Sequence, residues 1–295
     1  NNFTNKIMDR KQRLEQFLEI LEKREKPLPT TKPFISIVTI YDELNEAQWM
    51  ADFLASLPKV EEGVFELILC KCVPATGQKP EPKAPEIRNG ILTHYVTFPY
   101  AEWSFADARN VAATAASGEW ILALDTDEVL MQSQAEILSG VCKTAPKNIG
   151  AYSVNIYSQV GYNVNFEKAP VTRLYRNIPN VFYSCAIHET VMFSMNDLGL
   201  GHEESEISVF HNGYAANQDV LISKLERNLE MLGREYARYK HSHIKEYMKV
   251  HLFRTVFELQ RLQDEKEHRE TTSGHDGASR EALDYLSRVA ARIAA

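Results

Sequence analysis

The chain has 295 residues, of which 44% are hydrophobic and 25% are charged, a balance typical of a globular protein with a substantial core. This composition excludes a generally disordered or collagen-like chain, and no apolar run approaches the ~18–20 residues that a membrane-spanning helix needs. The 33 basic and 40 acidic residues give a net charge of −7, which does not favour a partner held mainly through phosphate charge.

The first segment is predicted to be a helix over residues 5–26, where apolar side chains recur at helical spacing between charged ones. Pro27, Pro29 and Pro33 would end this helix and form a stiff connection. No apolar signal-peptide region opens the sequence, so we expect a cytoplasmic protein, although a signal removed before Asn1 stays open.

Strands and helices then alternate. We predict strands at 34–40, 65–70, 91–98 and 120–124, and helices at 46–57, 106–116 and 129–138, with a Pro-rich loop at 74–85. This alternation implies parallel pairing and an α/β fold, with a mostly parallel doubly wound sheet that has helices on both faces.

The rest of the chain changes character twice. Strands are predicted at 151–158, 172–175 and 207–211, and from about residue 217 onward the pattern is helical. A flexible break is expected at 271–279, followed by a last helix at 280–293. Four scattered cysteines, Cys70, Cys72, Cys142 and Cys185, do not make a disulfide framework, and we interpret Cys70 and Cys72 as core thiols.

Three carboxylates, Asp125, Asp127 and Glu128, directly follow the predicted strand at 120–124. In an open parallel sheet, ligands bind beyond the carboxyl ends of the strands. Two carboxylates ~4 Å apart repel by roughly 4 kcal/mol at an effective dielectric of about 20, and a divalent cation turns this repulsion into attraction. We therefore expect Mg²⁺ or Mn²⁺ beside a diphosphate, while a surface turn that caps the next helix stays open.

Several segments share their order and spacing with one known family. Residues 105–110 read FADARN, residues 117–128 read SGEWILALDTDE, and residues 36–43 read SIVTIYDE. Together they resemble glycosyltransferase family 2, which has the GT-A fold and places an Ala-Arg-Asn helix before its Asp-x-Asp strand. The segments RLYRN at 173–177, IHE at 187–189 and HNGY at 211–214 are similar to a subgroup of that family with a helical C-terminal extension.

The resemblance implies a domain plan. Together with the segment pattern above, it predicts an N-terminal helix and connection at 1–33, a GT-A catalytic domain at 34–216 and a helical extension at 217–295. Within the catalytic domain, residues 34–130 would form the nucleotide-sugar half and residues 131–216 the acceptor half.

The resemblance also implies roles for individual residues. Contacts to the nucleotide-sugar are expected from Thr39, Tyr41, Glu43, Arg109, Asp125 and Thr126. Asp125, Asp127 and His211 are expected to hold the metal. Two alternatives stay open: Arg109 could form a structural ion pair, and His211 could be a packed residue at a strand end. A UDP-sugar is the expected donor. The Asp with which the family reads the base is missing from residues 67–73, so the identity of the base stays open.

An inverting transfer, the family's usual outcome, needs a base that takes the acceptor's proton. Glu189 is our candidate, with His188 beside it as a phosphate or metal contact. Glu128 is the alternative base, and Glu189 could instead be a structural ion-pair partner. The aromatic rings of Tyr100 and Trp103 could stack on the substrate or belong to the core.

The sequence thus predicts a metal-dependent glycosyltransferase that moves a sugar from a nucleoside diphosphate to an acceptor. That acceptor could be a sugar, a lipid carrier, a peptide or a modified nucleobase. A homo-oligomer through the terminal helices is possible. A nucleotidyltransferase would use similar acids, but it usually has a Gly-rich loop after its first strand, and residues 41–45 contain no glycine. A helical interaction protein with a degenerate transferase domain is the third alternative.

Overall fold

The computed structural model describes residues 33–75, 83–160, 165–211, 218–239 and 242–273. The predicted helices at 5–26 and 280–293 lie outside the described residues. The chain divides into two compact units, one of residues 1–184 and 189–214 and the other of residues 185–188 and 215–295.

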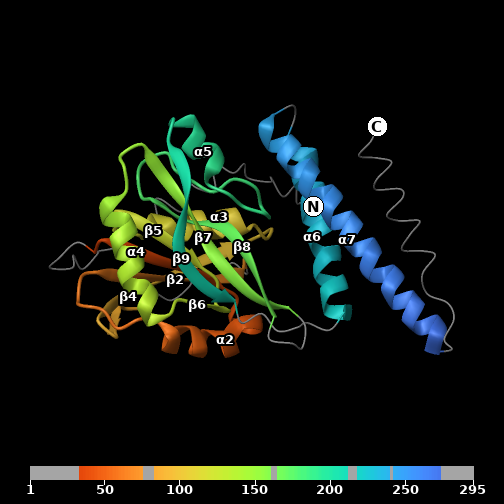
Figure 1. Ribbon diagram of the computed structural model, residues 1–295, viewed down its shortest axis with the longest axis horizontal. Coiled ribbons are helices and arrows are strands. Elements are labelled where there is room, and N and C mark those ends of the chain that lie inside the picture. The colour runs from red at the N-terminus through yellow and green to blue at the C-terminus, as the bar shows by residue number, and fades with distance from the viewer. Residues whose placement is uncertain (1–32, 76–82, 161–164, 212–217, 240–241, 274–295) are drawn as a thin grey trace, which may run out of the picture. The chain divides into compact units, whose positions relative to one another are not determined.

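The first unit is built on one nine-stranded sheet in the order β3-β4-β2-β1-β5-β8-β7-β9-β6 (Figure 1). The parallel strands are β4 (Ile91–Tyr100), β2 (Phe65–Pro74), β1 (Ile35–Tyr41) and β5 (Trp120–Leu124). β7 (Ile149–Val160) pairs parallel with β9 (Gly201–His211) and antiparallel with β8 (Asn165–Arg176), which in turn runs antiparallel to β5. The predicted α/β class and its parallel strands are confirmed.

The described residues of this unit also form two short strands and four helices. The strands β3 (Glu86–Arg88) and β6 (Glu128–Val129) lie at the two edges of the sheet. The helices are α2 (Glu43–Ser56), α3 (Phe105–Thr114), α4 (Gln132–Thr144) and α5 (Met192–Asp197).

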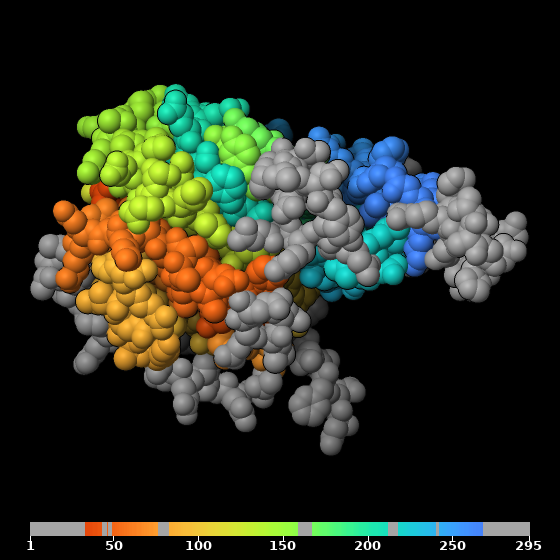
Figure 2. Space-filling model, turned by 60° about the horizontal axis from the view of Figure 1, so that its bottom comes forward, coloured from red at the N-terminus to blue at the C-terminus, as the bar shows by residue number. Residues whose placement is uncertain are grey.

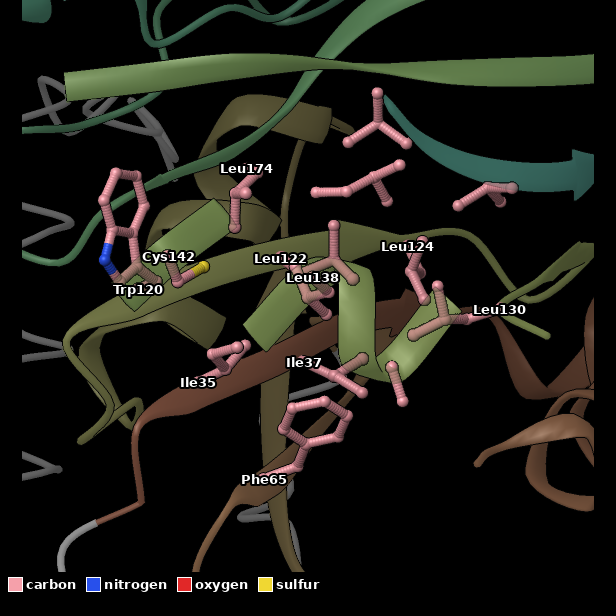
Figure 3. Close-up of a cluster of buried hydrophobic side chains, with 14 of the residues drawn as sticks. Ile35, Ile37, Phe65, Trp120, Leu122, Leu124, Leu130, Leu138, Cys142 and Leu174 are labelled. Carbon is pink, nitrogen blue, oxygen red and sulfur yellow. The ribbon is translucent and has the colours of Figure 1, made fainter. Parts of the chain in front are cut away.

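Helices cover both faces of the sheet, as predicted. On one face, alternate residues such as Ile37 and Leu122 pack with α2 and α4 in one buried cluster (Figure 3). Hydrogen bonds between Lys59 and Gln132 join the ends of α2 and α4, whose surfaces are seen side by side in Figure 2. On the other face, the intervening strand residues pack with α3 and α5. All four cysteines are buried thiols that form no disulfide, and Cys70 and Cys72 belong to the second cluster.

The helix predicted to start at residue 129 starts instead at Gln132. Glu128 and Val129 form β6, because they pair with His211 and Phe210 of β9. A two-residue strand of this kind is set by its partner, which lies more than eighty residues further along the chain. Such a strand has no periodicity of its own to predict.

Arg176 and Asn177 hold the parallel and antiparallel parts of the sheet together. The Arg176 guanidinium donates to the carbonyls of Ala145 and Pro146, just after α4, and to that of Ile149, the first residue of β7. It also lies 4.4 Å from the centre of the Trp120 ring. The Asn177 amide donates to the carbonyls of Ala116 and Gly118, just before β5. The second half of the RLYRN segment is therefore structural.

Near the N-terminal end of β1, the buried carboxylate of Glu66 accepts hydrogen bonds from several donors. Its oxygens accept from Ser36 Oγ at 2.5 Å and from the backbone N–H and Oγ of Ser117 at 2.5 and 3.0 Å. The Gly118 N–H lies 3.2 Å away and His94 Nε2 3.5 Å away. Burial raises the pKa of Glu66, but the hydrogen bonds from His94, Ser36 and Ser117 outweigh it and lower the pKa overall.

Replacing this carboxylate is expected to destabilise the first unit. Glu66→Gln should lower the free energy of unfolding by about 2–4 kcal/mol, because a buried amide cannot accept from all of these donors. Since the folded pKa lies below the ordinary 4.5, the advantage of the native carboxylate is present above pH 4.5 and is lost as the pH falls through the folded pKa. Urea unfolding at pH 7 and at pH 3–4 measures both effects. The exposed Glu119→Gln is the control, and equal stability of the two variants would contradict this role.

The second unit contains two long helices, α6 (Gln218–Arg238) and α7 (His243–Ser273), which pack along a buried stripe. The stripe includes Leu232, Leu252 and Leu259. Because α7 continues to Ser273, the predicted break at 271–279 starts too early: residues 271–273 are helical. Among the described residues, no helix combines the length and apolarity that crossing a bilayer requires.

Candidate active site

The acidic segment after β5 forms a closed turn. The Asp125 N–H donates to Glu128 Oε2 at 2.8 Å, and the Glu128 N–H donates back to the Asp125 carbonyl at 3.1 Å. β5 fixes the start of this turn and β6 fixes its end, so Asp125, Thr126 and Asp127 lie beyond the carboxyl end of a central strand. The structure therefore places the Asp-x-Asp where α/β sheets usually bind ligands.

Two arginines share the carboxylate of Asp125. Arg109 Nη2 donates to Oδ1 and Arg173 Nη2 donates to Oδ2, each at 2.6 Å. Burial alone would raise the pKa of Asp125, but the positive charges of Arg173 and Arg109 hold it well below its usual range. Asp125 is therefore an anion whose two oxygens both have a cationic partner.

Arg173 also binds Glu128. Its Nη2 lies 3.0 Å from Glu128 Oε1, and Glu128 is only 3% exposed. Burial raises the pKa of Glu128, and the neighbouring charge of Asp125 adds to this although Arg173 opposes it. A carboxyl this deeply buried has little room to meet an acceptor, so the geometry favours a structural role for Glu128 over the alternative role of base.

Arg109 connects Asp125 to Glu189. Its Nε donates to Glu189 Oε1 at 2.7 Å, although the two residues are 80 positions apart in the chain. The Arg109 side chain is 2% exposed, and its Nη1 has no hydrogen-bond partner among the described residues. Burial lowers the pKa of Arg109, but Asp125 and Glu189 raise it well above the ordinary value, so the guanidinium stays charged.

Asp127 forms a separate pair with His211. His211 Nε2 lies 3.0 Å from Asp127 Oδ2, and its Nδ1 lies 3.1 Å from Ser158 Oγ. The hydrogen bond to Asp127 raises the pKa of His211, although burial opposes it. The side chains of Asp127 and His211 are 30% and 33% exposed, so this pair is partly open to solvent, as is the Asp125 carboxylate at 36%, whereas the Arg109 side chain is only 2% exposed.

A fifth carboxylate, which the sequence analysis missed, belongs to Glu46 in the first turns of α2. Its Oε2 accepts from the Asp42 N–H at 2.6 Å. Burial raises the pKa of Glu46, and the charges of Asp125, Asp127 and Asp42 raise it further. Glu46 therefore lies within electrostatic reach of both aspartates of the Asp-x-Asp. The sequence signal was an acid in the first turn after a buried strand.

The residues predicted to bind the nucleotide have different exposures. Thr39 and Thr126 are buried, and Thr39 Oγ1 has no hydrogen-bond partner in the described part of the chain. Tyr41 is half-buried at the end of β1, and Glu43 begins α2. These positions surround the carboxyl end of β1, and their contacts to a nucleotide stay predictions.

Three aromatic side chains, starting at the last residue of β4, pack against one another in sequence order. The Tyr100 and Trp103 rings meet edge-on with centroids 5.0 Å apart, and Trp103 meets Phe105 at 5.1 Å. All three pack against the buried cluster beneath α3. Ser104 accepts from the Asp107 N–H and so caps α3, the helix that carries Arg109. These contacts support the core interpretation of both Tyr100 and Trp103.

His188 belongs to the second unit, whereas Glu189 belongs to the first. The His188 ring stacks on His251 with centroids 4.1 Å apart, and Tyr247 Oη donates to the His188 carbonyl at 3.0 Å. Burial lowers the pKa of His188, and burial together with His188 lowers that of His251 to about 4. The described contacts of His188 lie within the second unit, and its role as a phosphate or metal contact stays a prediction.

No protein-family model matches the chain. A curated TPR repeat-containing protein of Synechococcus elongatus is 30% identical over 151 residues, which make up 50% of this chain and 33% of that protein. The match thus spans only about a third of the length of the curated relative.

Several solved structures that are similar to this chain are glycosyltransferases of the GT-A type. The mannosyltransferase PcManGT of Pyrobaculum calidifontis, in complex with GDP-Man and Mn2+, has a TM-score of 0.48 and 11% identity, over 96% of this chain and 88% of that chain. TarS of S. aureus in complex with UDP-GlcNAc has a TM-score of 0.45 and 12% identity, over 76% and 73%. Glucosyl-3-phosphoglycerate synthase of Mycobacterium tuberculosis has a TM-score of 0.41 and 12% identity, over 69% and 80%. Similarity at this level does not by itself assign the chain to a family.

Proposed function

We propose that the chain is a metal-dependent glycosyltransferase of family 2, with a GT-A catalytic domain at 34–216 and a helical extension at 217–295. It moves a sugar from a nucleoside diphosphate, with a UDP-sugar as the expected donor, to an acceptor nucleophile with inversion. One observation carries this proposal: the partly exposed Asp127, paired with His211 of β9, lies in the same turn as an Asp125 that accepts from two arginines. Cationic and anionic groups thus meet at the carboxyl end of a central strand, which suits a diphosphate and its metal.

The proposed reaction requires residues that can hold a divalent metal. Among the described side chains, no group of three or more His, Cys, Asp or Glu is arranged around one point. Asp127 Oδ2 and His211 Nε2 lie 3.0 Å apart in a hydrogen bond. A divalent cation would take the place of the proton that these two atoms share. Asp127 and His211 are therefore the residues that would hold Mn²⁺ or Mg²⁺, and the diphosphate of the donor would supply further oxygens.

Asp125 has a different position from Asp127. Both of its oxygens accept from guanidinium groups, so it would reach a cation only if one of these bonds were exchanged. We assign the metal chiefly to Asp127 and His211 and keep Asp125 as a contact to the donor. When bound, the cation would supply positive charge that stabilises the departing diphosphate.

The transfer itself needs a group that accepts one proton. In our assignment, the Glu189 carboxylate takes the proton from the acceptor as the acceptor atom forms its bond to the anomeric carbon. The bond between that carbon and the diphosphate oxygen breaks on the opposite face, and its electron pair leaves with the nucleoside diphosphate. Thr39, Tyr41, Glu43 and Thr126 would surround the nucleoside. The acceptor, a cytoplasmic location and a homo-oligomer through the terminal helices stay open.

A donor-hydrolysis screen tests the proposal without an acceptor, because many transferases slowly pass the sugar to water. We expect release of free sugar and nucleoside diphosphate from at least one nucleotide-sugar with Mn²⁺ or Mg²⁺, and a strong reduction with excess EDTA. The screen should include nucleoside triphosphates. Release of pyrophosphate from these, with every nucleotide-sugar intact, would contradict the proposal and favour the nucleotidyltransferase alternative.

A further inference from the structure

We propose that Arg109 is a positioning residue, whose buried guanidinium holds the Glu189 carboxylate at a fixed place relative to Asp125. This inference rests on the proposed function, since it takes Glu189 as the base. The resemblance alone predicts instead that Arg109 faces the nucleotide. The contacts of the guanidinium decide between the two roles.

The first observation is how Arg109 divides its donors. Nε and Nη2 lie on one edge of the guanidinium, and this edge commonly binds a single carboxylate through two parallel hydrogen bonds. Here Nε donates to Glu189 at 2.7 Å and Nη2 donates to Asp125 at 2.6 Å. Because the group is planar and rigid, the two carboxylates it bridges are held at one separation.

The second observation is that the bridge itself cannot easily move. Asn110, the next residue on α3, donates to the Tyr183 carbonyl at 2.9 Å and accepts from the Tyr183 N–H at 2.7 Å. The Tyr183 ring lies under the Arg109 guanidinium at 5.8 Å. The helix that carries Arg109 is thereby tied to the chain six residues before Glu189, so both ends of the Arg109–Glu189 contact have backbone support.

The third observation is charge and burial. Arg109 is 2% exposed, and its single positive charge is paired with two carboxylates. These carboxylates compensate the charge, so Arg109 would attract a diphosphate only weakly. The more exposed Asp127–His211 pair is better placed to meet the donor. The geometry therefore favours a role in which Arg109 acts through Glu189 rather than on the substrate.

A double-mutant cycle separates this role from a merely structural one. Arg109→Met is expected to lower kcat for transfer ~10²-fold in the wild type, because a base displaced by about 1 Å loses its alignment. In the Glu189→Gln background, the same change should lower kcat by less than about 3-fold, since no base is left to position. Arg173→Met is the matched control: Arg173 also binds Asp125 at 2.6 Å, but no hydrogen bond joins it to Glu189 among the described residues. Its effect should be equal in both backgrounds.

The donor constants and a second variant complete the test. The donor KM of Arg109→Met should change less than about 3-fold, and Arg109→Lys should not restore kcat, because one ammonium cannot reproduce the fork. Arg109→Lys keeps the charge and gives a second reading if Arg109→Met does not fold, as judged by thermal unfolding. If Arg109→Met lowered kcat as much in the Glu189→Gln background as in the wild type, or changed only the donor KM, the positioning role of Arg109 would be wrong. The proposed function would still stand. A wild type that transfers no sugar would overturn the proposed function as well.

Discussion

Glu189→Gln is expected to lower the rate of sugar transfer by about 10²–10⁴-fold while the protein still binds its donor. The amide keeps the size of the side chain and can still accept from Arg109 Nε, which lies 2.7 Å from the native Oε1. It cannot take a proton from the acceptor. Initial rates with labelled donor give the transfer, and the thermal shift with Mn²⁺ and donor gives the binding.

Two further variants make this result specific. The exposed Glu204→Gln on β9 should retain full transfer, which controls for the loss of one negative charge. Glu128→Gln tests the alternative base, and we expect it to reduce stability because Arg173 loses a charged partner at 3.0 Å. Full transfer by Glu189→Gln, together with a collapse in a folded Glu128→Gln protein, would reassign the base to Glu128.

Asp127→Ala is expected to abolish the stabilisation that Mn²⁺ and a UDP-sugar together give the wild type. A ligand present at about 100 times its Kd adds about 2.7 kcal/mol to the folded state, which corresponds to a shift of roughly 5–10 °C in a unit of this size. Without Asp127 the pair at 3.0 Å is lost, and His211 alone is a weak site for a hard cation.

The matched control for this variant is Asp197→Ala on α5, where an exposed aspartate is removed from the same unit. It should keep the full shift. Differential scanning fluorimetry of the three proteins, each with Mn²⁺ alone, donor alone and both, completes the comparison. A shift in Asp127→Ala equal to that of the wild type would remove the metal from this residue.

The parallel strands and the Asp-x-Asp were predictable from the sequence for local reasons. The strands are short apolar runs, and the helices between them have a 3.6-residue period. The elements missed were β3, β6 and α5, each of two to six residues. Their existence depends on pairing or packing with distant residues, as when β9 fixes Glu128 in β6.

The partners within the site were harder to predict than its acids. The antiparallel register of β5 and β8 brings Arg173 to Asp125, although the two residues are 48 positions apart in the sequence. No pattern in the sequence near either residue predicts this contact. Within the RLYRN segment, Arg173 lies at the site whereas Arg176 and Asn177 stabilise the fold. The sequence motif therefore marks a functionally or structurally important segment, but it does not show which of its residues belong to the site and which stabilise the fold.

A crystal structure with Mn²⁺ and a UDP-sugar tests the central claim most directly, because manganese can be located by its anomalous scattering. We expect one manganese peak within coordinating distance of Asp127 Oδ2 and His211 Nε2, with the diphosphate bound to the same ion. A donor bound away from the carboxyl ends of β1 and β5, or a saturated crystal with no manganese at Asp127, would contradict the account.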